Sequence, residues 1–100
     1  MIRKIAEYKV KQGQVGEAEQ AIKEFVAAIS KEETDTFYTA FQRADGCSFI
    51  HFMAFPDQAA EKKHQHAPYT LKFVEALYPA CEEEPSFTSL TLIQSSGQGI

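Results

Sequence analysis

The feature that most constrains the fold is a pair of apolar stretches, residues 36–43 and 49–55, on either side of Asp45-Gly46. An Asp-Gly dipeptide favours a two-residue type I′ turn, in which both positions take a positive φ. The two stretches are therefore predicted to form an antiparallel hairpin. In that register the paired residues are Tyr38 and Met53, Ala40 and His51, and Gln42 and Phe49.

Both faces of this hairpin are largely apolar, whereas a sheet with water on one side shows a cleaner alternation of apolar and polar residues. One face carries Phe37, Thr39, Phe41, Ile50, Phe52 and Ala54. The other carries Tyr38, Ala40, Gln42, Phe49, His51 and Met53. We expect the chain's own helices to cover the first face. The second would then meet the identical sheet of another copy, with a cavity between the two sheets.

The rest of the chain completes one domain. Pro56 ends the second hairpin strand, and Asp57 is a good N-cap for a helix that carries His64 about two turns later. The other predicted elements are a strand over 2–10, a helix that ends near Ser30, a break or restart at Pro68, and a last strand from Phe87 to Gln94. This β-α-β-β-α-β order predicts an α+β, ferredoxin-like split β-α-β fold with an antiparallel sheet. Residues 1–94 form the domain, and 95–100 are a flexible tail.

Charge and composition exclude several classes of protein. The net charge is −4 and no Lys/Arg cluster is present, which argues against nucleic-acid binding. The first ten residues lack the apolar core of a signal peptide, and no segment is long enough to span a membrane. Cys47 and Cys81 have no CxxC spacing, so we expect reduced thiols and a cytoplasmic protein. His64 and His66 cannot share a metal from one helix face, and no metal site is expected.

The whole pattern resembles the antibiotic biosynthesis monooxygenase-like proteins, which are dimeric α+β barrels. The residues that carry the resemblance are Tyr8-x-Val10, Gly13, Phe55, Asp57, Ala60, His64, Ala67-Pro68, Phe73 and the final FTSLTLI. The resemblance implies a homodimer and a pocket to which the helix histidine, here His64, belongs. The family includes quinol- and anthrone-oxidising members, haem-degrading members and many without a known activity.

Three positions depart from the usual pattern of that family. Met53 stands where an acidic residue is frequent, Phe55 where Trp is frequent, and Tyr69 where a second histidine is frequent. Haem-degrading relatives depend on an Asn, a Trp and a His, and this chain contains neither Asn nor Trp. Haem degradation is therefore excluded.

The side chains then predict a site for cofactor-free chemistry. A general base works best with a pKa near ambient pH, so histidine is the natural candidate, and His64 takes that role. The alternative is a helix histidine that caps a carbonyl. His51 and Tyr38 are candidate polar contacts to a substrate, although each would equally serve as a core residue. The remaining candidates are Gln42 near the hairpin end and an apolar wall of Phe49, Met53 and Phe55.

Two functions follow from this site. The first is a cofactor-independent monooxygenase that oxidises a small aromatic or quinol-like substrate between the sheets of a homodimer. The second is a non-catalytic small-ligand-binding or stress-response protein on the same scaffold, because one fold hosts many functions. An enclosed cavity with His64 at its wall would favour a ligand, and a filled interface would favour a structural dimer.

Overall fold

The computed structural model describes residues 1–97 as four strands and three α-helices. The elements are β1 (Ile2–Lys9), α1 (Val15–Glu32), β2 (Phe37–Gln42), β3 (Ser48–Phe55), α2 (Gln58–His66), α3 (Pro68–Leu77), a 3₁₀ turn (Tyr78–Ala80) and β4 (Ser86–Leu90). The strands form one antiparallel sheet in the order β2-β3-β1-β4. The predicted α+β, ferredoxin-like fold is confirmed.

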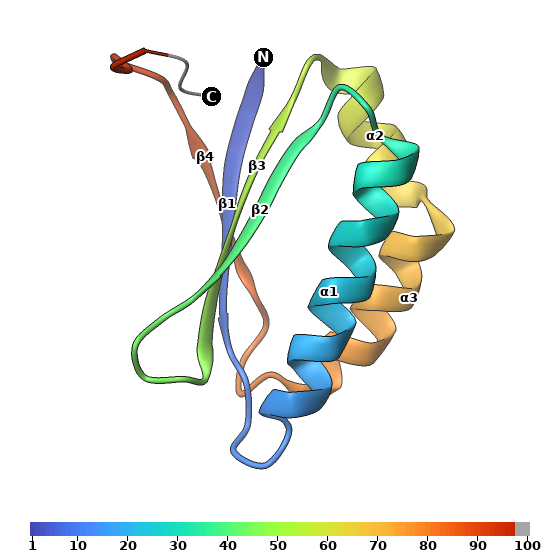
Figure 1. Cartoon of the computed structure of the whole chain (residues 1–100), viewed down its shortest axis with the longest axis vertical. Helices are drawn as coiled ribbons and strands as arrows, with labels where there is room; N and C mark the ends of the chain where they lie inside the picture. Colours follow the sequence, from blue (N-terminus) through green and yellow to red (C-terminus); the bar gives the residue numbers. More distant parts are fainter. Residues whose placement is uncertain (98–100) are drawn as a thin grey trace.

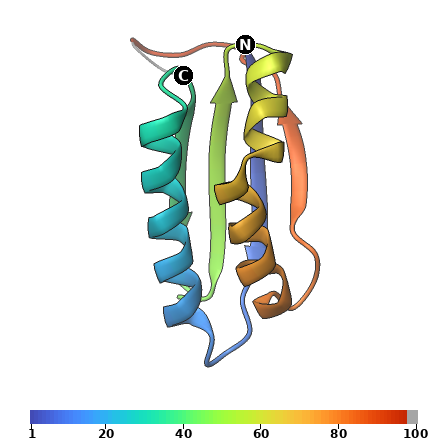
Figure 2. The same cartoon turned by 90° about the vertical axis from the view of Figure 1, so that its right-hand side faces the viewer.

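The helices lie side by side on one face of the sheet and leave the other face bare (Figures 1 and 2). β4, at the edge of the sheet, has no helix in front of it in Figure 2. No helix within the described residues is long and apolar enough to cross a bilayer. Helix α1 continues to Glu32 instead of ending near Ser30, and β4 ends at Leu90 instead of Gln94. The predicted tail over 95–100 lies partly outside the described residues.

The hairpin has the predicted register but a different turn. Tyr38 pairs with Met53, and Ala40 with His51. The strands close at a hydrogen bond from the Arg43 N–H to the Ser48 carbonyl, 2.8 Å. The type I′ prediction is wrong, because that turn needs a positive φ at both Asp45 and Gly46. Gly46 has a φ of 79°, but no residue other than glycine has a positive φ in the described chain, so Asp45 does not. The Asp45 carboxylate instead accepts from the Ser48 hydroxyl at 2.6 Å and from the Ser48 N–H at 2.8 Å. These hydrogen bonds, first of all the one from the hydroxyl, lower the pKa of Asp45 to about 2.

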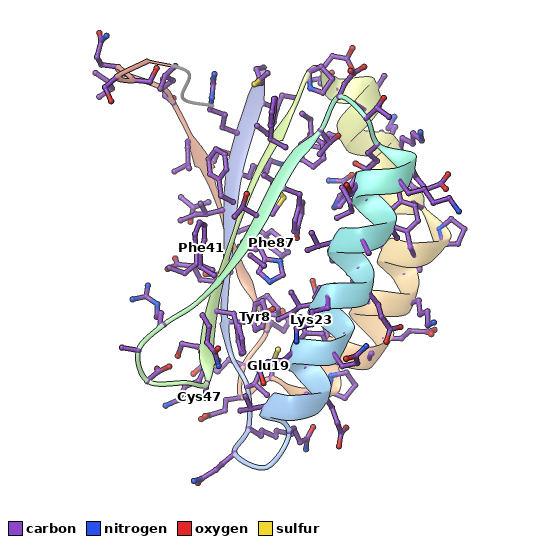
Figure 3. All side chains as sticks on the ribbon, in the orientation of Figure 1. Tyr8, Glu19, Lys23, Phe41, Cys47 and Phe87 are labelled. Atoms are coloured by element: carbon purple, nitrogen blue, oxygen red, sulfur yellow. The ribbon has the colours of Figure 1, made fainter. Side chains whose placement is uncertain are left out.

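The two faces of the sheet are the reverse of what the sequence predicted. Phe49, His51 and Met53 are buried beneath the helices, whereas Phe37 and Phe41 are 50% and 56% exposed on the bare face. Figure 3 shows Phe41 on the side of the sheet away from the helices. The predicted cavity wall therefore faces the chain's own helices and not the sheet of a second copy.

The central strand β1 explains this orientation. In the β1–β3 pairing, Tyr8 lies opposite Phe49 and Ala6 opposite His51, so these four side chains share one face. The neighbouring Glu7 and Lys9 point to the other face, and charged side chains are costly to bury. The helices accordingly cover the apolar face of β1, and the β3 residues that share this face are buried with it.

Local signals around Pro68 separate α2 from α3. The Asp57 carboxylate accepts the Ala60 N–H at 2.8 Å and caps the start of α2. Ala67 is extended, with φ −66° and ψ 144°, as expected for a residue before proline. Pro68 then occupies the first position of α3, where its missing N–H costs no helical bond. The bend brings both helices over the same sheet.

Candidate functional site

A cavity of about 280 Å³ lies between the sheet and the helices of a single chain. Its walls are mostly apolar and aromatic, and they include Ala6, Tyr8, Phe25, Tyr38, His51, Met53, Phe55, His64, Thr70, Phe73 and Leu77. Figure 3 shows Tyr8 directed from the sheet toward the helices. Tyr78 and Phe87, 36% and 59% exposed, also line the cavity and lie toward its opening. The cavity thus lies within a single chain, in contrast to the predicted space between two sheets.

His64 is buried at the wall of this cavity, on α2. The rings of Phe25, Tyr38 and Phe55 surround its imidazole, with centroids 5.6, 5.6 and 5.1 Å away. Its Nδ1 lies 2.9 Å from Oε2 of Glu33. No hydrogen-bond partner for Nε2 is found among residues 1–97. An ionised carboxylate only accepts hydrogen bonds, so a neutral His64 beside such a carboxylate carries its hydrogen at Nδ1 and has its lone pair at Nε2.

Glu33 holds this imidazole from the end of α1. The residue follows the last helical turn, where its N–H donates to the Ile29 carbonyl at 2.8 Å. The Tyr69 hydroxyl donates to the same Oε2 at 2.6 Å, and burial, followed by this hydrogen bond and the charge of Glu33, raises the pKa of the hydroxyl. The second carboxylate oxygen, Oε1, is buried without a partner in the described structure. A buried carboxylate that fixes one histidine tautomer is the usual support for a general base.

A second polar cluster joins Tyr8, His51 and Tyr38 on the sheet side of the cavity. The Tyr8 hydroxyl lies 2.7 Å from Nε2 of His51, and the Tyr38 hydroxyl lies 2.7 Å from Nδ1. His51 is 1% exposed, and burial lowers its pKa to about 4. Burial also raises the pKa of both tyrosines. All three side chains are therefore uncharged at neutral pH.

Two further polar features belong to the cavity. The Thr70 hydroxyl on α3 is buried with no partner within residues 1–97, and Thr70 lines the cavity. Lys4 and Glu61 form an ion pair, and both residues line the cavity. No group of three His, Cys, Asp or Glu side chains in the described residues is placed to hold a metal ion.

The structure brings most of the predicted site residues together. His64, Tyr38, His51, Met53 and Phe55 all line the cavity. Two predicted residues lie elsewhere. Phe49 is buried against Tyr8, with ring centroids 5.5 Å apart, and Gln42 is exposed and donates to the Gly46 carbonyl in the hairpin loop.

Glu33, Tyr69 and Thr70 are the site residues that sequence reasoning missed. Glu33 appeared to be part of a polar connection after the helix. One signal does point to it, because Glu33 follows Ile29 by four residues and so continues the buried side of α1 that contains Phe25 and Ile29. An acidic side chain on an apolar stripe needs a buried partner, and the histidine on α2 is that partner.

The chain is similar to one family of known proteins and to several solved structures. The family model for antibiotic biosynthesis monooxygenases matches residues 1–76. None of the curated proteins that were compared matches the chain. A solved structure described as an antibiotic biosynthesis monooxygenase superposes with a TM-score of 0.85 at 17% identity, over 94% of this chain and 100% of the other.

Two more solved structures are described provisionally as antibiotic biosynthesis monooxygenases. The protein from Caulobacter crescentus has a TM-score of 0.83 at 18% identity, over 93% of this chain and 90% of its own. The protein from Bacteroides thetaiotaomicron has a TM-score of 0.88 at 15% identity, over 99% and 94%. At these identities the likeness concerns the fold alone.

Proposed function

Because this chain belongs to the antibiotic biosynthesis monooxygenase family, we propose that it is a cofactor-independent monooxygenase that oxidises a small aromatic or quinol-like compound in the cavity of each protomer. The observation that carries the proposal is the Glu33–His64 pair. It presents an imidazole with a free Nε2 to a mostly apolar cavity. His64 is the general base, and Glu33 is the positioning residue.

The proposed chemistry needs a base and a dry cavity. Nε2 of His64 removes a proton from an electron-rich phenol or quinol, and the resulting anion passes one electron to O₂. The two radicals combine in a C–O bond, and the peroxide takes back the proton from His64. The peroxide forms at a ring carbon that bears a hydrogen, and loss of water from the hydroperoxide leaves a carbonyl there, so one oxygen atom enters the product and the other leaves as water. The apolar walls keep competing water from the intermediates.

The size of the cavity limits the substrate. A volume of about 280 Å³ lies just below the usual range of ligand pockets, which is roughly 300–1,000 Å³. Aromatic rings line much of the space, including Phe25, Phe55 and Phe73. We therefore propose a flat substrate of one or two fused rings.

Oxygen uptake tests the proposal directly. Purified protein is assayed with catechol, hydroquinone and 1,4-naphthalenediol beside two variants, His64→Ala and His66→Ala. His66 lies on the same helix but is exposed and binds the Lys62 carbonyl, so it is a matched control. We expect protein-dependent uptake that is lost in His64→Ala and kept in His66→Ala. Equal uptake in all three proteins would remove His64 from the mechanism. Ligand binding without any uptake would favour the non-catalytic small-ligand-binding function.

The bare face of the sheet supports a homodimer. Its apolar side chains are Ile5, Phe37, Phe41, Ile50, Phe52 and Leu90. Phe37, Phe41 and Leu90 are 50%, 56% and 38% exposed, and an apolar patch of this kind marks an interface. A second copy is the proposed occupant, packed sheet to sheet.

Sedimentation of two matched variants checks the dimer. Phe41→Glu places a charge on the bare face, and Leu71→Glu places one on the exposed side of α3, where Leu71 is 54% exposed. Neither side chain belongs to the core of one protomer. We expect a dimeric wild type, a monomeric Phe41→Glu and a dimeric Leu71→Glu. A monomeric wild type at micromolar concentration would refute the dimer.

A further inference from the structure

The Tyr8–His51–Tyr38 cluster has more hydrogens than its own hydrogen bonds use. Each ring nitrogen of His51 lies 2.7 Å from one tyrosine hydroxyl. Neither hydroxyl has another hydrogen-bond partner among residues 1–97. Tyr8 and His51 are buried, and all three side chains line the cavity. The only remaining neighbour for an unused hydrogen is therefore the cavity itself.

Counting hydrogens in this cluster gives a definite result. A neutral imidazole has one N–H and one bare nitrogen. The bare nitrogen accepts the O–H of one tyrosine, and the N–H donates to the oxygen of the other. The second tyrosine then keeps its own O–H unused. Either tyrosine can be the second one, depending on which nitrogen of His51 carries the hydrogen.

We propose that this unused phenolic O–H binds an acceptor oxygen, a carbonyl or phenolate, on the ligand of the cavity. Tyr8 and Tyr38 supply the donor interchangeably through the tautomer of His51. The cavity thus has a hydrogen-bond donor on its sheet side and an acceptor, Nε2 of His64, on its helix side. The ring of Tyr38 is near both histidines, with its centroid 5.5 Å from that of His51 and 5.6 Å from that of His64.

This inference adds a binding contact to the proposed function. It rests on the proposed function in one respect, that the cavity is a ligand site. A donor with no internal partner is costly to bury, and the cost is recovered when a ligand oxygen accepts from it. A purely aromatic hydrocarbon leaves the donor unpaired. The ligand class is therefore a one- or two-ring compound that has a carbonyl or a phenolic oxygen.

Two probes of nearly equal shape test the donor. 1-Tetralone has one carbonyl oxygen and no hydroxyl, and tetralin has neither. NMR titration of the folded protein gives a dissociation constant for each probe, and the ratio of the two constants reports the carbonyl contact. In the double variant Tyr8→Phe/Tyr38→Phe we expect the preference for 1-tetralone to fall roughly 2- to 12-fold. Each single variant keeps one O–H that can turn to the ligand, so each should keep most of the preference.

Control variants separate this inference from the proposed oxygenase. Tyr78→Phe removes another hydroxyl that lines the cavity and should leave the ratio unchanged. His66→Ala changes an exposed residue outside the cavity lining and should also keep the ratio. If the wild type takes up no oxygen but the double variant still loses the preference, the donor site is supported and the proposed oxygenase is not. An unchanged ratio in the double variant, or a lost ratio in Tyr78→Phe, overturns the proposal.

A measurement on the wild type tests the proposal even if the double variant does not fold. The ¹⁵N shifts of the His51 side chain distinguish one protonated nitrogen from two. We expect one N–H and one bare nitrogen at pH 7. Two protonated nitrogens at that pH would mean that both tyrosines accept from His51, and this would overturn the proposed exchange of a single donor between Tyr8 and Tyr38 through the tautomer.

Discussion

Replacing Glu33 with Gln should slow the proposed reaction without weakening substrate binding. The substitution keeps the shape of the side chain and an oxygen that can accept from Nδ1 of His64 and from Tyr69, 2.9 and 2.6 Å away. It removes the negative charge. Because His64 becomes positively charged only after it takes a proton, the lost charge affects the transition state more than the bound substrate.

The magnitude follows from the kind of hydrogen bond that is lost. Hydrogen bonds to charged groups contribute about 1.5–3 kcal/mol, whereas neutral ones contribute about 0.5–1.5 kcal/mol. Both side chains of the pair are buried, so solvent screens the interaction little. A loss of about 1–2 kcal/mol corresponds to a decrease in kcat of roughly 5- to 30-fold. KM should stay near its wild-type value.

Two readouts distinguish this positioning role from a structural one. Steady-state oxygen uptake, with whichever compound the wild type oxidises, gives kcat and KM separately, and a thermal melt confirms that the variant is folded. The ¹⁵N spectrum of His64 needs no substrate, and it should show the hydrogen at Nδ1 in the wild type and a mixture of tautomers in Glu33→Gln. An unchanged kcat, or a change in KM alone, would refute the reasoning.

Two further predictions concern stability. Burial lowers the pKa of His51 from 6.5 to about 4, so the unfolded chain binds a proton more readily than the folded one. The contribution of His51 is fully present above pH 6.5 and is lost as the pH falls toward 4, by up to about 3 kcal/mol. Urea unfolding at pH 7 and pH 4.5 should show a smaller pH effect in His51→Phe than in the wild type, and an equal effect would contradict the prediction. Thr70→Val removes a buried hydroxyl without a partner in the described residues. The free energy of unfolding should therefore stay equal or rise by about 1 kcal/mol. A decrease of more than about 1 kcal/mol would contradict the prediction, because it would mean that the hydroxyl has a hydrogen-bond partner.

The sequence predicted the local parts of the fold and missed what depends on distant pairing. The hairpin register followed from two neighbouring stretches, and the break at Pro68 followed from proline chemistry. Alternation divided β2 and β3 into two faces, but both faces were apolar and nothing local indicated which one the helices cover. The deciding fact is the pairing of Tyr8 with Phe49. This contact joins residues far apart in the chain, and no spacing within either strand specifies it.

The candidate site shows the same division between local and distant information. The helix after Asp57 carries His64, which lies at the wall of the cavity within the chain. Its partner Glu33 lies 31 residues earlier, beyond a different helix. Only the apolar stripe of α1 connects Glu33 to the buried side, and the acidic residues around it made the segment look like a solvated loop.

The two polar clusters favour a ligand over a purely structural role because neither is complete by itself. A structural network in a core uses every donor and acceptor that it buries. Here His64 keeps a free acceptor, and the Tyr8–His51–Tyr38 cluster keeps a free donor. A single phenolic hydroxyl on a ligand complements both, since it donates to Nε2 of His64 and accepts from a tyrosine. When the base removes the proton, the ligand oxygen gains negative charge and its bond from the tyrosine strengthens. Under the proposed function, the arrangement therefore stabilises the phenolate more than the phenol, and this difference is what accelerates proton removal.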